Sequence, residues 1–404
     1  MKAFYLLCAG RAACCVGTMA FAGALPVARN EWHIDAASAG AIQTVFNISS
    51  ALALFVTSWL SDYYGPRRLY LLFSWSGGAA LLAFGLFAHS FHSALLLISF
   101  VGITQGGAYT PAVMLAMQMH HPAKRGYAVG MILAAGSLGY LLSLFMATWG
   151  ALSWGIVIAF YLCSAGAFFG AMLSSLSLKG KMHDPAPVPP ARPDTVKGHR
   201  KRNTVALLLL IGYVAHCWEL LGNWTWTPGL LVASLSPYHL SPLMNGLLIA
   251  SAIHLSGMLS TLTVGTVSDY FNRTTVLIFM AGAGAVMSLL TGWSASWGAG
   301  WVLLFAITGS FFILGDSGVL SAAIADNVAP ASLGRVMGIR SLLGFGAGSL
   351  APLCFGRVMD LTGSWKIAYC VLATGGGVAF LCAVLIYLSQ RRSCIAETKQ
   401  RSGL

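Results

Sequence analysis

Long runs of apolar residues, separated by short polar segments, occupy almost the whole chain. A helix needs about 20 mostly apolar residues to cross about 30 Å of hydrocarbon, and a backbone in lipid has to satisfy its hydrogen bonds within its own segment, as a helix does. The pattern therefore predicts an all-α membrane protein with twelve transmembrane helices. The first six are expected at 5–26, 37–60, 69–89, 93–119, 127–150 and 153–176, and the other six at 204–234, 241–267, 274–293, 299–325, 334–358 and 366–388.

A proline-rich and basic segment separates the sixth predicted span from the seventh. It reads KGKMHDPAPVPPARPDTVKGHRKRN and contains almost no large apolar residue, which is typical of a solvated linker. The expected organisation is a first six-helix bundle at 1–178, the linker at 179–203, a second six-helix bundle at 204–390 and a cytoplasmic tail at 391–404.

The amino-terminal segment allows two interpretations. Met1 and Lys2, followed by an apolar run and by small residues at 20–24, would suit a secretory signal peptide. Arg11, however, interrupts the apolar core that such a signal requires. We therefore expect this segment to be retained as the first transmembrane helix.

The composition agrees with a membrane protein and excludes a soluble one. Hydrophobic residues make up 57% of the chain and charged residues 8%, with a mean hydropathy of +0.76, whereas soluble domains have about 45–50% apolar and about 25% charged residues. The cysteines, all of which except Cys394 lie in apolar runs without metal-finger spacing, are expected to act as bulky hydrophobic residues. No cofactor is predicted.

The net charge of +12 could indicate nucleic-acid binding, so the positions of the charges are decisive. The basic residues form short clusters between apolar runs, such as Arg67-Arg68 and Arg391-Arg392, which is typical of cytoplasmic loops rather than of a nucleic-acid-binding face. An even number of spans puts both termini on one side, and the positive-inside rule predicts that this side is the cytoplasm. The basic residues expected near the outer side or within spans are Arg29, Arg357, Lys366, Arg11 and Arg340. The expected partners are a lipid bilayer and a small solute, and no nucleic acid.

Two charged phrases recur half a chain apart. SDYYGPRRLY stands at 61–70 and SDYFNRTTVL at 268–277, and each places an aspartate between the second and third predicted span of its half. A second pair of similar stretches, RGYAVGMILAAGSLG at 125–139 and GRVMGIRSLLGFGAG at 334–348, has almost the same offset. The sequence therefore predicts two pseudo-symmetric six-helix halves.

The first phrase resembles the loop signature of the major facilitator superfamily, in which an aspartate, a glycine and two basic residues follow a small residue at fixed spacing. In SWLSDYYGPRRLY, Ser58 replaces the usual first glycine, and the second copy has Asn272 in place of the later glycine. The resemblance implies the fold of this superfamily, alternating access, and a gating latch between the halves on the cytoplasmic side. The latch residues are Asp62, Gly65, Arg67, Arg68, Gly265, Asp269 and Arg273. A second interpretation is that Arg67 and Arg68 only bind anionic lipid.

Two further resemblances bear on function. GITQGGAYTPAVML in the fourth span resembles the glycine-rich fourth helix of the superfamily, but Gly102 stands where an arginine is often found. This difference argues against a direct transfer of the antiporter proton mechanism. The stretches 213–231 and 315–335 resemble a bacterial branch of the superfamily that includes a copper importer serving cytochrome oxidase assembly and a riboflavin transporter.

Four charged residues are predicted at membrane depth, two acidic (Glu219 and Asp316) and two basic (Arg11 and Arg340). A charge in the middle of the bilayer costs about 2.5–3.5 kcal/mol on insertion scales. We therefore expect these residues to neutralise one another across a central cavity and to bind substrate or protons. Glu219 is the first candidate for coupling, because Pro228 and two nearby glycines loosen its helix. The alternatives are a fixed ion pair of Glu219 with Arg11 or Arg340, and a helix-packing role for Asp316.

Asn47, Gln105 and Tyr109 are candidates for hydrogen bonds to the substrate, with the alternative that they bond a neighbouring helix. Trp218, Trp224 and Trp226 are candidates for stacking a planar substrate or holding a cation. The alternative for these tryptophans is an outer aromatic belt, which is expected above all for Trp224 and Trp226. His254 and Met258, four residues apart on one helical face, could bind Cu(I), and His254 could instead take part in proton coupling.

Together these features predict a secondary active transporter that moves a small solute, coupled to protons, across a bacterial inner membrane as a monomer. The alternatives within the superfamily are a copper importer and a riboflavin transporter, and the alternative from another class is a membrane sensor that binds without cycling. An enzyme is not expected, because the sequence contains no phosphate-binding loop, dinucleotide motif or recognisable nucleophile with its base.

Overall fold

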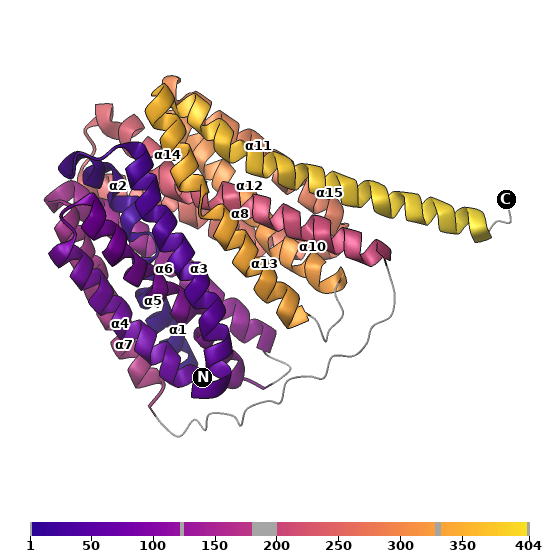
Figure 1. Cartoon of the computed structure of the whole chain (residues 1–404), viewed down its shortest axis with the longest axis horizontal. Helices are drawn as coiled ribbons and strands as arrows, with labels where there is room; N and C mark the ends of the chain where they lie inside the picture. The colour runs from indigo at the N-terminus through magenta and orange to yellow at the C-terminus, as the bar shows by residue number, and fades with distance from the viewer. Residues whose placement is uncertain (1, 122–124, 180–199, 328–332, 402–404) are drawn as a thin grey trace.

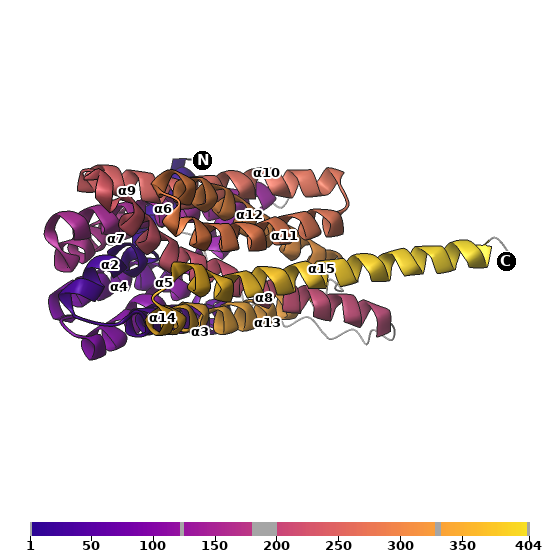
Figure 2. The ribbon, with the colours of Figure 1, turned by 90° about the horizontal axis from the view of Figure 1, so that it is seen from above.

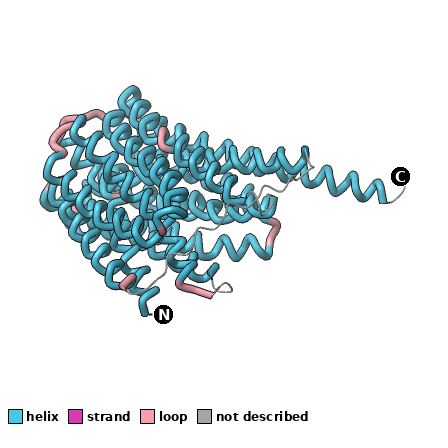
Figure 3. The backbone as a smooth tube through the Cα atoms, turned by 60° about the horizontal axis from the view of Figure 1, so that its bottom comes forward, coloured by secondary structure: helices cyan, strands magenta, loops and turns pink. Residues whose placement is uncertain are grey.

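The computed structural model describes residues 2–121, 125–179, 200–327 and 333–401. Within these ranges the chain forms helices joined by short turns, and no strand is present (Figure 3). Most of the predicted linker at 179–203 and the end of the predicted tail lie outside the described residues. The elements are α1 (Lys2–Cys14), η1 (Cys15–Gly17), α2 (Ala20–Glu31), α3 (Ala36–Tyr64), α4 (Pro66–Phe87), α5 (Phe91–Gln118), α6 (Arg125–Trp154), α7 (Ile156–Ser177), α8 (Arg200–Leu235), η3 (Ser236–Tyr238), α9 (Pro242–Ala250), η4 (Ser251–Leu255), α10 (Ser256–Tyr270), α11 (Arg273–Trp293), η5 (Ser294–Ser296), α12 (Ala299–Asn327), α13 (Leu333–Gly348), α14 (Ala351–Thr362) and α15 (Trp365–Arg401).

Twelve helical segments in the described ranges are long and apolar enough to cross a membrane. The predicted number of spans is therefore confirmed, and the chain is a multi-pass membrane protein. Three spans have an irregular turn inside them. The first, Lys2–Glu31, contains the 3-10 turn η1, the eighth, Pro242–Gly265, contains the π-helix η4, and the eleventh, Gly338–Thr362, is divided between α13 and α14.

The helices form two groups that lie side by side. Helices α1–α7 carry the first six spans and α8–α15 carry the other six. In Figure 1 the first group runs from indigo to magenta and the second from pink to yellow. Figure 2 shows α3 of the first group next to α14 of the second, where the groups meet. The long α15 continues beyond the bundle toward the carboxyl terminus (Figures 1 and 2).

The two ends of the bundle are marked by glycine turns. Gly65 ends α3 with a φ of +81°, and Gly155 separates α6 from α7 with a φ of +88°. A side chain with a Cβ rarely adopts such angles, so glycine suits both positions. We call the end that holds the α3–α4 turn and the start of α1 the Gly65 end, and the opposite end, with the α2–α3 and α6–α7 turns, the Gly155 end.

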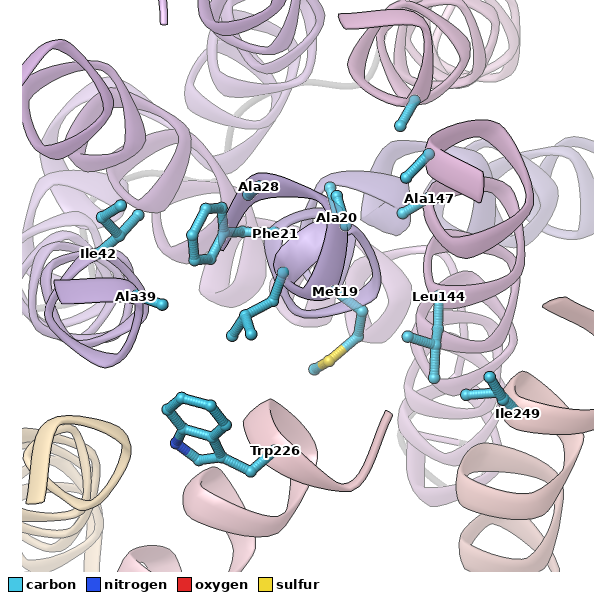
Figure 4. Packing of buried hydrophobic residues seen from close by; sticks show 14 of the residues in the cluster. Met19, Ala20, Phe21, Ala28, Ala39, Ile42, Leu144, Ala147, Trp226 and Ile249 are labelled. Atoms are coloured by element: carbon cyan, nitrogen blue, oxygen red, sulfur yellow. The ribbon is translucent and has the colours of Figure 1, made fainter. Parts of the chain in front are cut away.

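The two groups share an apolar core only toward the Gly155 end of the described structure. There, buried side chains of both groups form one cluster, in which Met19 and Leu144 of the first group lie near Trp226 and Ile249 of the second (Figure 4). Toward the Gly65 end each group has its own core. The core of the first group lies around Tyr70, and the second group has a separate core. The groups are therefore held together mainly at the Gly155 end.

Small residues let α3 and α14 cross closely at this end. A Cβ added to Gly40 would meet the backbone of Pro352, and one added to Gly356 would meet the backbone of Ala36. Close backbone approach through small residues is the usual way in which membrane helices pack. One turn farther along α3, the Thr44 hydroxyl donates to the carbonyl oxygen of a residue between α13 and α14 at 2.6 Å.

A carboxylate of the second group caps a helix of the first. The two oxygens of Asp360 in α14 accept hydrogen bonds from the backbone N–H groups of Ala36 (2.8 Å) and Ala37 (2.7 Å), which begin α3. These N–H groups have no partner within their own helix, and they carry the positive end of its dipole. Asp35 caps the same helix locally, and hydrogen bonds from Ser38 lower the pKa of Asp35. The contribution of Asp35 is thus complete above the usual aspartate pKa and is lost as the pH falls through the lowered value.

Replacing Asp360 by alanine should destabilise the junction between the groups. Loss of a capping carboxylate costs about 1–2 kcal/mol, and here the lost cap also joins α14 to α3. We expect a lower Tm for the purified variant in detergent at a fixed scan rate, and a smaller loss for Asp360→Asn, which keeps one acceptor oxygen. Arg357→Ala, an exposed change on the same helix, is the control. A Tm for Asp360→Ala equal to that of the control would mean that the cross-group cap contributes nothing.

Candidate functional site

A buried arginine of the first group lies among aromatic side chains. Arg11 of α1 is 4% exposed, and its Cζ lies 5.8 Å from the centroid of the Tyr109 ring in α5. Arg11, Tyr109 and Tyr140 of α6 line one pocket together with apolar residues of α5 and α6. The predicted candidates Arg11 and Tyr109 are therefore brought together.

A second buried arginine comes from the other group. Arg340 of α13 is 6% exposed, and its Cζ lies 3.6 Å from the centroid of the Tyr213 ring in α8, a cation–π contact. Helix α13, which carries Arg340, packs against α3 of the first group, so this arginine belongs to a helix at the boundary between the groups. Each helix group thus supplies one buried guanidinium next to a tyrosine ring.

Three aromatic rings, one from the first group and two from the second, lie next to the pocket of Arg11. The ring centroid of Tyr140 lies 5.8 Å from that of Trp224 in α8 and 6.3 Å from that of His254 in η4. Trp224 and His254 are themselves 5.6 Å apart. Because Tyr140 also lines the pocket of Arg11, Trp224 and His254 of the second group lie next to a wall of that pocket.

The Glu219 carboxylate lies inside the second group. Its Oε1 accepts a hydrogen bond from the Ser288 hydroxyl of α11 at 2.6 Å, and the Asn223 side chain donates to the same hydroxyl at 3.2 Å. A Cβ added to Gly376 of α15 would contact the Glu219 carboxylate. The carboxylate therefore lies between α8, α11 and α15, and the predicted ion pair with Arg11 or Arg340 is replaced by a bond to a serine.

Asp316 also faces the interior of the second group. Its Oδ1 lies 2.8 Å from Nδ1 of His216 in α8, and both side chains are buried. The carboxylate borders an apolar pocket formed by α8, α11, α12 and α15. The expected mutual neutralisation of the four charges across a central cavity is thus wrong. The physical reason is that each acid finds a polar partner inside its own group.

Two predicted substrate contacts are occupied by neighbouring helices. The Gln105 amide donates to the Cys14 carbonyl oxygen at 3.2 Å and accepts from the Thr18 hydroxyl at 3.1 Å, on either side of the η1 turn. The Trp218 indole donates to the Val371 carbonyl oxygen at 2.8 Å. For Gln105 the helix-bonding alternative fits the geometry, and the indole of Trp218 likewise bonds a neighbouring helix. Asn47 differs, because its buried Nδ2 has no hydrogen-bond partner among the described residues.

The latch residues lie at the Gly65 end. Asp62 and Arg68 are exposed there, Arg67 is half-buried, and Gly65 forms the turn itself. In the second copy, the ion pair that the structure shows joins Arg273 to Asp326 of the same group, with Nε and Oδ2 3.2 Å apart. Gly265 has open space beside its backbone, and the side chain of Asp269 lies outside the described structure. The latch between the halves remains a prediction.

Asn272 explains why the second copy of the phrase needs no glycine. Its side-chain oxygen accepts from the backbone N–H groups of Thr274 at 2.9 Å and Thr275 at 3.4 Å, and so caps α11. Asparagine is among the best residues at this position of a helix. The first copy instead turns at Gly65 and starts α4 with Pro66.

The expected aromatic belt is wrong for both tryptophans assigned to it. Trp226 is 0% exposed, stacks on Phe355 with 4.9 Å between ring centroids, and donates its indole N–H to the Pro352 carbonyl oxygen at 3.0 Å. Trp224 packs against Tyr140 and His254, as described above. A helix that packs at the boundary of two groups buries side chains which its sequence alone would place at the lipid surface.

The proposed copper ligands receive no further donor from the structure. Met258 is half-buried one turn beyond His254, and the described part of the chain contains no group of three His, Cys, Asp or Glu side chains that could hold a metal ion. The rings next to His254 belong to Tyr140 and Trp224.

Four residues of the site were not selected from the sequence: Tyr140, Tyr213, His216 and Ser288. For His216 a signal was present, because it precedes Glu219 by three residues and so lies near it on the helix. Tyrosine and serine are too common in membrane helices to stand out without a partner. Their roles depend on which helices face each other, which a single sequence does not state.

Comparisons with known proteins place these features in a family. A model of the Major Facilitator Superfamily matches residues 7–315. The probable sulfoacetate transporter SauU of Cupriavidus necator is 24% identical over 390 residues, which cover 90% of this chain and 88% of that protein. The hexuronate transporter of Bacillus subtilis is 26% identical over 393 residues, which again cover 90% of this chain and 88% of that protein.

Solved structures of transporters share the fold. The nucleoside transporter NupG superimposes with a TM-score of 0.74 at 14% identity, covering 96% of this chain and 100% of that one. A peptide transporter, POT, gives a TM-score of 0.75 at 14% identity, covering 97% and 94%. At such identities the likeness concerns the fold alone. With the family match over most of its length and two pseudo-symmetric halves of six spans each, this chain belongs to the major facilitator superfamily and is a transporter of small solutes rather than an enzyme.

Proposed function

We propose that this protein carries a small organic anion across the membrane by alternating access, coupled to protons. The observation that supports the anion is the pair of buried arginines, Arg11 and Arg340, which come from opposite halves and each lie next to a tyrosine ring. Alternating access requires the two halves to close around a substrate in turn, and a ligand held by one arginine from each half would respond to that motion.

A buried arginine needs a negative partner or water. Arg11 lies at membrane depth, where an unpaired charge is costly, and neither Glu219 nor Asp316 is its partner, because Ser288 and His216 contact these two acids. A carboxylate, which arginine binds through two parallel N–H···O bonds, would neutralise the site. A cation such as copper would meet two guanidinium charges instead, and no observation favours a flavin.

The relatives point to the same chemical class. The substrates in the names of the two relatives, sulfoacetate and hexuronate, are both organic anions. We transfer only this class to the present chain, since an identity of 24–26% leaves room for a change of substrate. The two halves are taken as residues 1–178 and 204–390, with both termini in the cytoplasm of a bacterium. The Gly65 end is then cytoplasmic, and the latch residues act there in a monomer.

Proton coupling is assigned to Glu219 in the second half, with His216 one turn before it on α8 and Asp316 of α12 next to His216. A carboxyl can bind and release a proton without a permanent partner, whereas the arginines stay charged. In this arrangement the anion and the proton occupy different sites: the anion lies between the halves, and the proton lies within the second half.

Uptake by the purified protein in proteoliposomes tests this function. Labelled sulfoacetate and glucuronate are offered with and without an inward proton gradient, beside glucose as an uncharged control and Cu(I) as a cation. We expect at least one anion to accumulate with the gradient, and a protonophore to abolish the accumulation. Uptake of glucose or Cu(I) in place of the anions would contradict the proposal, and anion binding without any uptake would identify a sensor.

A further inference from the structure

We propose that His254 recognises a hydroxyl group of the transported anion, so that the substrate is a hydroxylated carboxylate such as a sugar acid. This inference rests on the proposed function, because it takes Arg11 as the group that binds the carboxylate. In this view Arg11 binds the carboxylate, and His254 selects among anions by contacting the other end of the substrate.

His254 lies beside the pocket that holds Arg11. Arg11 and Tyr140 line one pocket, and the Tyr140 ring lies next to the His254 ring, 6.3 Å between centroids. Trp224 closes the third side, 5.6 Å from His254. A ligand whose carboxylate rests on Arg11 would therefore extend past Tyr140 toward the imidazole. The walls between the two polar ends are aromatic, as in most pockets that bind small molecules.

The imidazole has an atom that no protein group satisfies. His254 is 4% exposed, and its Nε2 is buried without a hydrogen-bond partner among the described residues. Buried polar atoms in native proteins are nearly always paired, and an exception calls for a reason. A ligand that supplies the missing hydrogen bond is such a reason at this position, because the site lies between the two halves.

The backbone around His254 is itself irregular. Residues Ser251–Leu255 form a π-helix within the eighth span. A π-turn interrupts the regular hydrogen-bond pattern of an α-helix, and such turns are found frequently at functional sites. Here it sets the direction of His254 relative to α9 and α10 on either side. The turn and the unpaired nitrogen are independent observations that point to the same residue.

A hydroxyl is the group that suits this nitrogen best. In a neutral imidazole, Nε2 either donates or accepts, depending on the tautomer. A hydroxyl can do both, so it fits either tautomer, whereas a second carboxylate can only accept. The side chains that the structure places against the imidazole are the aromatic rings of Tyr140 and Trp224. This favours an uncharged polar group at this end of the substrate.

The test compares glucuronate with its monodeoxy analogues at the hydroxyl-bearing ring carbons in proteoliposomes. For the wild-type protein we expect one analogue to have a KM about 10-fold to 100-fold higher than that of glucuronate, because this analogue lacks the hydroxyl that pairs with Nε2. In His254→Phe, which keeps a ring but no nitrogen, the KM values of glucuronate and of this analogue should agree to within about twofold. His254→Gln, which restores a hydrogen-bonding group, should recover most of the discrimination.

Controls separate this inference from the function on which it rests. Leu255→Ala changes the exposed neighbour and should leave the KM ratio unchanged, and His254→Leu replaces the phenylalanine variant if that protein does not elute as a folded monomer. Persistent discrimination in the phenylalanine or leucine variant would overturn the role of His254. A wild-type protein that takes up sulfoacetate but not glucuronate would overturn the hydroxylated class while the anion function stands. Failure to transport any anion would contradict both the role of His254 and the proposed anion transport.

Discussion

Replacing Arg11 by glutamine is expected to reduce anion uptake by about 100-fold to 4,000-fold. Removing one partner of a buried, hydrogen-bonded ion pair costs about 3–5 kcal/mol, because the other charge stays buried without compensation, and each 1.4 kcal/mol is about tenfold. Arg11 is buried beside Tyr109 and Tyr140, so water would replace its guanidinium poorly. The measurement is kcat/KM for uptake of the anion that the proteoliposome assay identifies.

Arg340→Gln should produce a loss of similar size, and the double variant should lose less than the sum of the two. Two groups that bind the same carboxylate are coupled, and a double-mutant cycle measures that coupling. Arg11→Lys should retain part of the uptake, because lysine keeps the charge but not the paired N–H donors. The control is Arg357→Gln, an exposed arginine of α14. Uptake by Arg11→Gln equal to that of this control would exclude Arg11 from the anion site.

The helices of this fold could be predicted from the sequence to within a few residues. The second span was expected at 37–60 and runs over Ala36–Tyr64, and the seventh was expected at 204–234 and runs over Thr204–Tyr238. The apolar pattern carries this information because length and hydropathy alone decide whether a segment can span a bilayer. The interruptions were not predicted. The π-helix at Ser251–Leu255 lies in an apolar run like any other, and no proline or glycine within it marks the place.

The charged residues of the site could be identified from the sequence, but their partners could not. A charge inside an apolar run is visible at once, so Arg11, Arg340, Glu219 and Asp316 were all found. Which way each side chain points depends on how its helix is rotated against its neighbours. Glu219 faces Ser288 of α11 rather than the boundary between the groups. The sequence holds no signal for that rotation until the other helices are in place.

The observed arrangement also changes how coupling would work. If the acids and the arginines neutralised each other in one cavity, a proton and an anion would compete for the same groups. With the arginines at the boundary and the acids inside the second half, both ligands can be bound at once. Asn223 provides a link between them, because it lies on α8 between Glu219 and the ring of Trp224, and its side chain bonds Ser288. A change at Glu219 could then reach the boundary through α8.

Replacing Glu219 by glutamine should therefore abolish proton-driven accumulation and spare exchange. Glutamine has nearly the same shape and keeps an oxygen that can accept from Ser288, but it cannot bind or release a proton. With an inward proton gradient, the ratio of internal to external anion should fall to about 1, the value expected without coupling. Exchange of labelled for unlabelled anion at equal concentrations requires no net proton movement, so it should continue.

Two further variants make this result specific. Glu31→Gln changes an exposed glutamate at the Gly155 end in the same way, and it should accumulate anion as the wild type does. Ser288→Ala leaves the Glu219 carboxyl in place without its hydrogen-bond donor, and it should shift the pH at which accumulation is half-maximal rather than abolish it. Accumulation by Glu219→Gln that still follows the proton gradient would assign coupling to another group. Loss of exchange together with accumulation would place Glu219 in the anion site, because only a residue needed to hold the anion affects both.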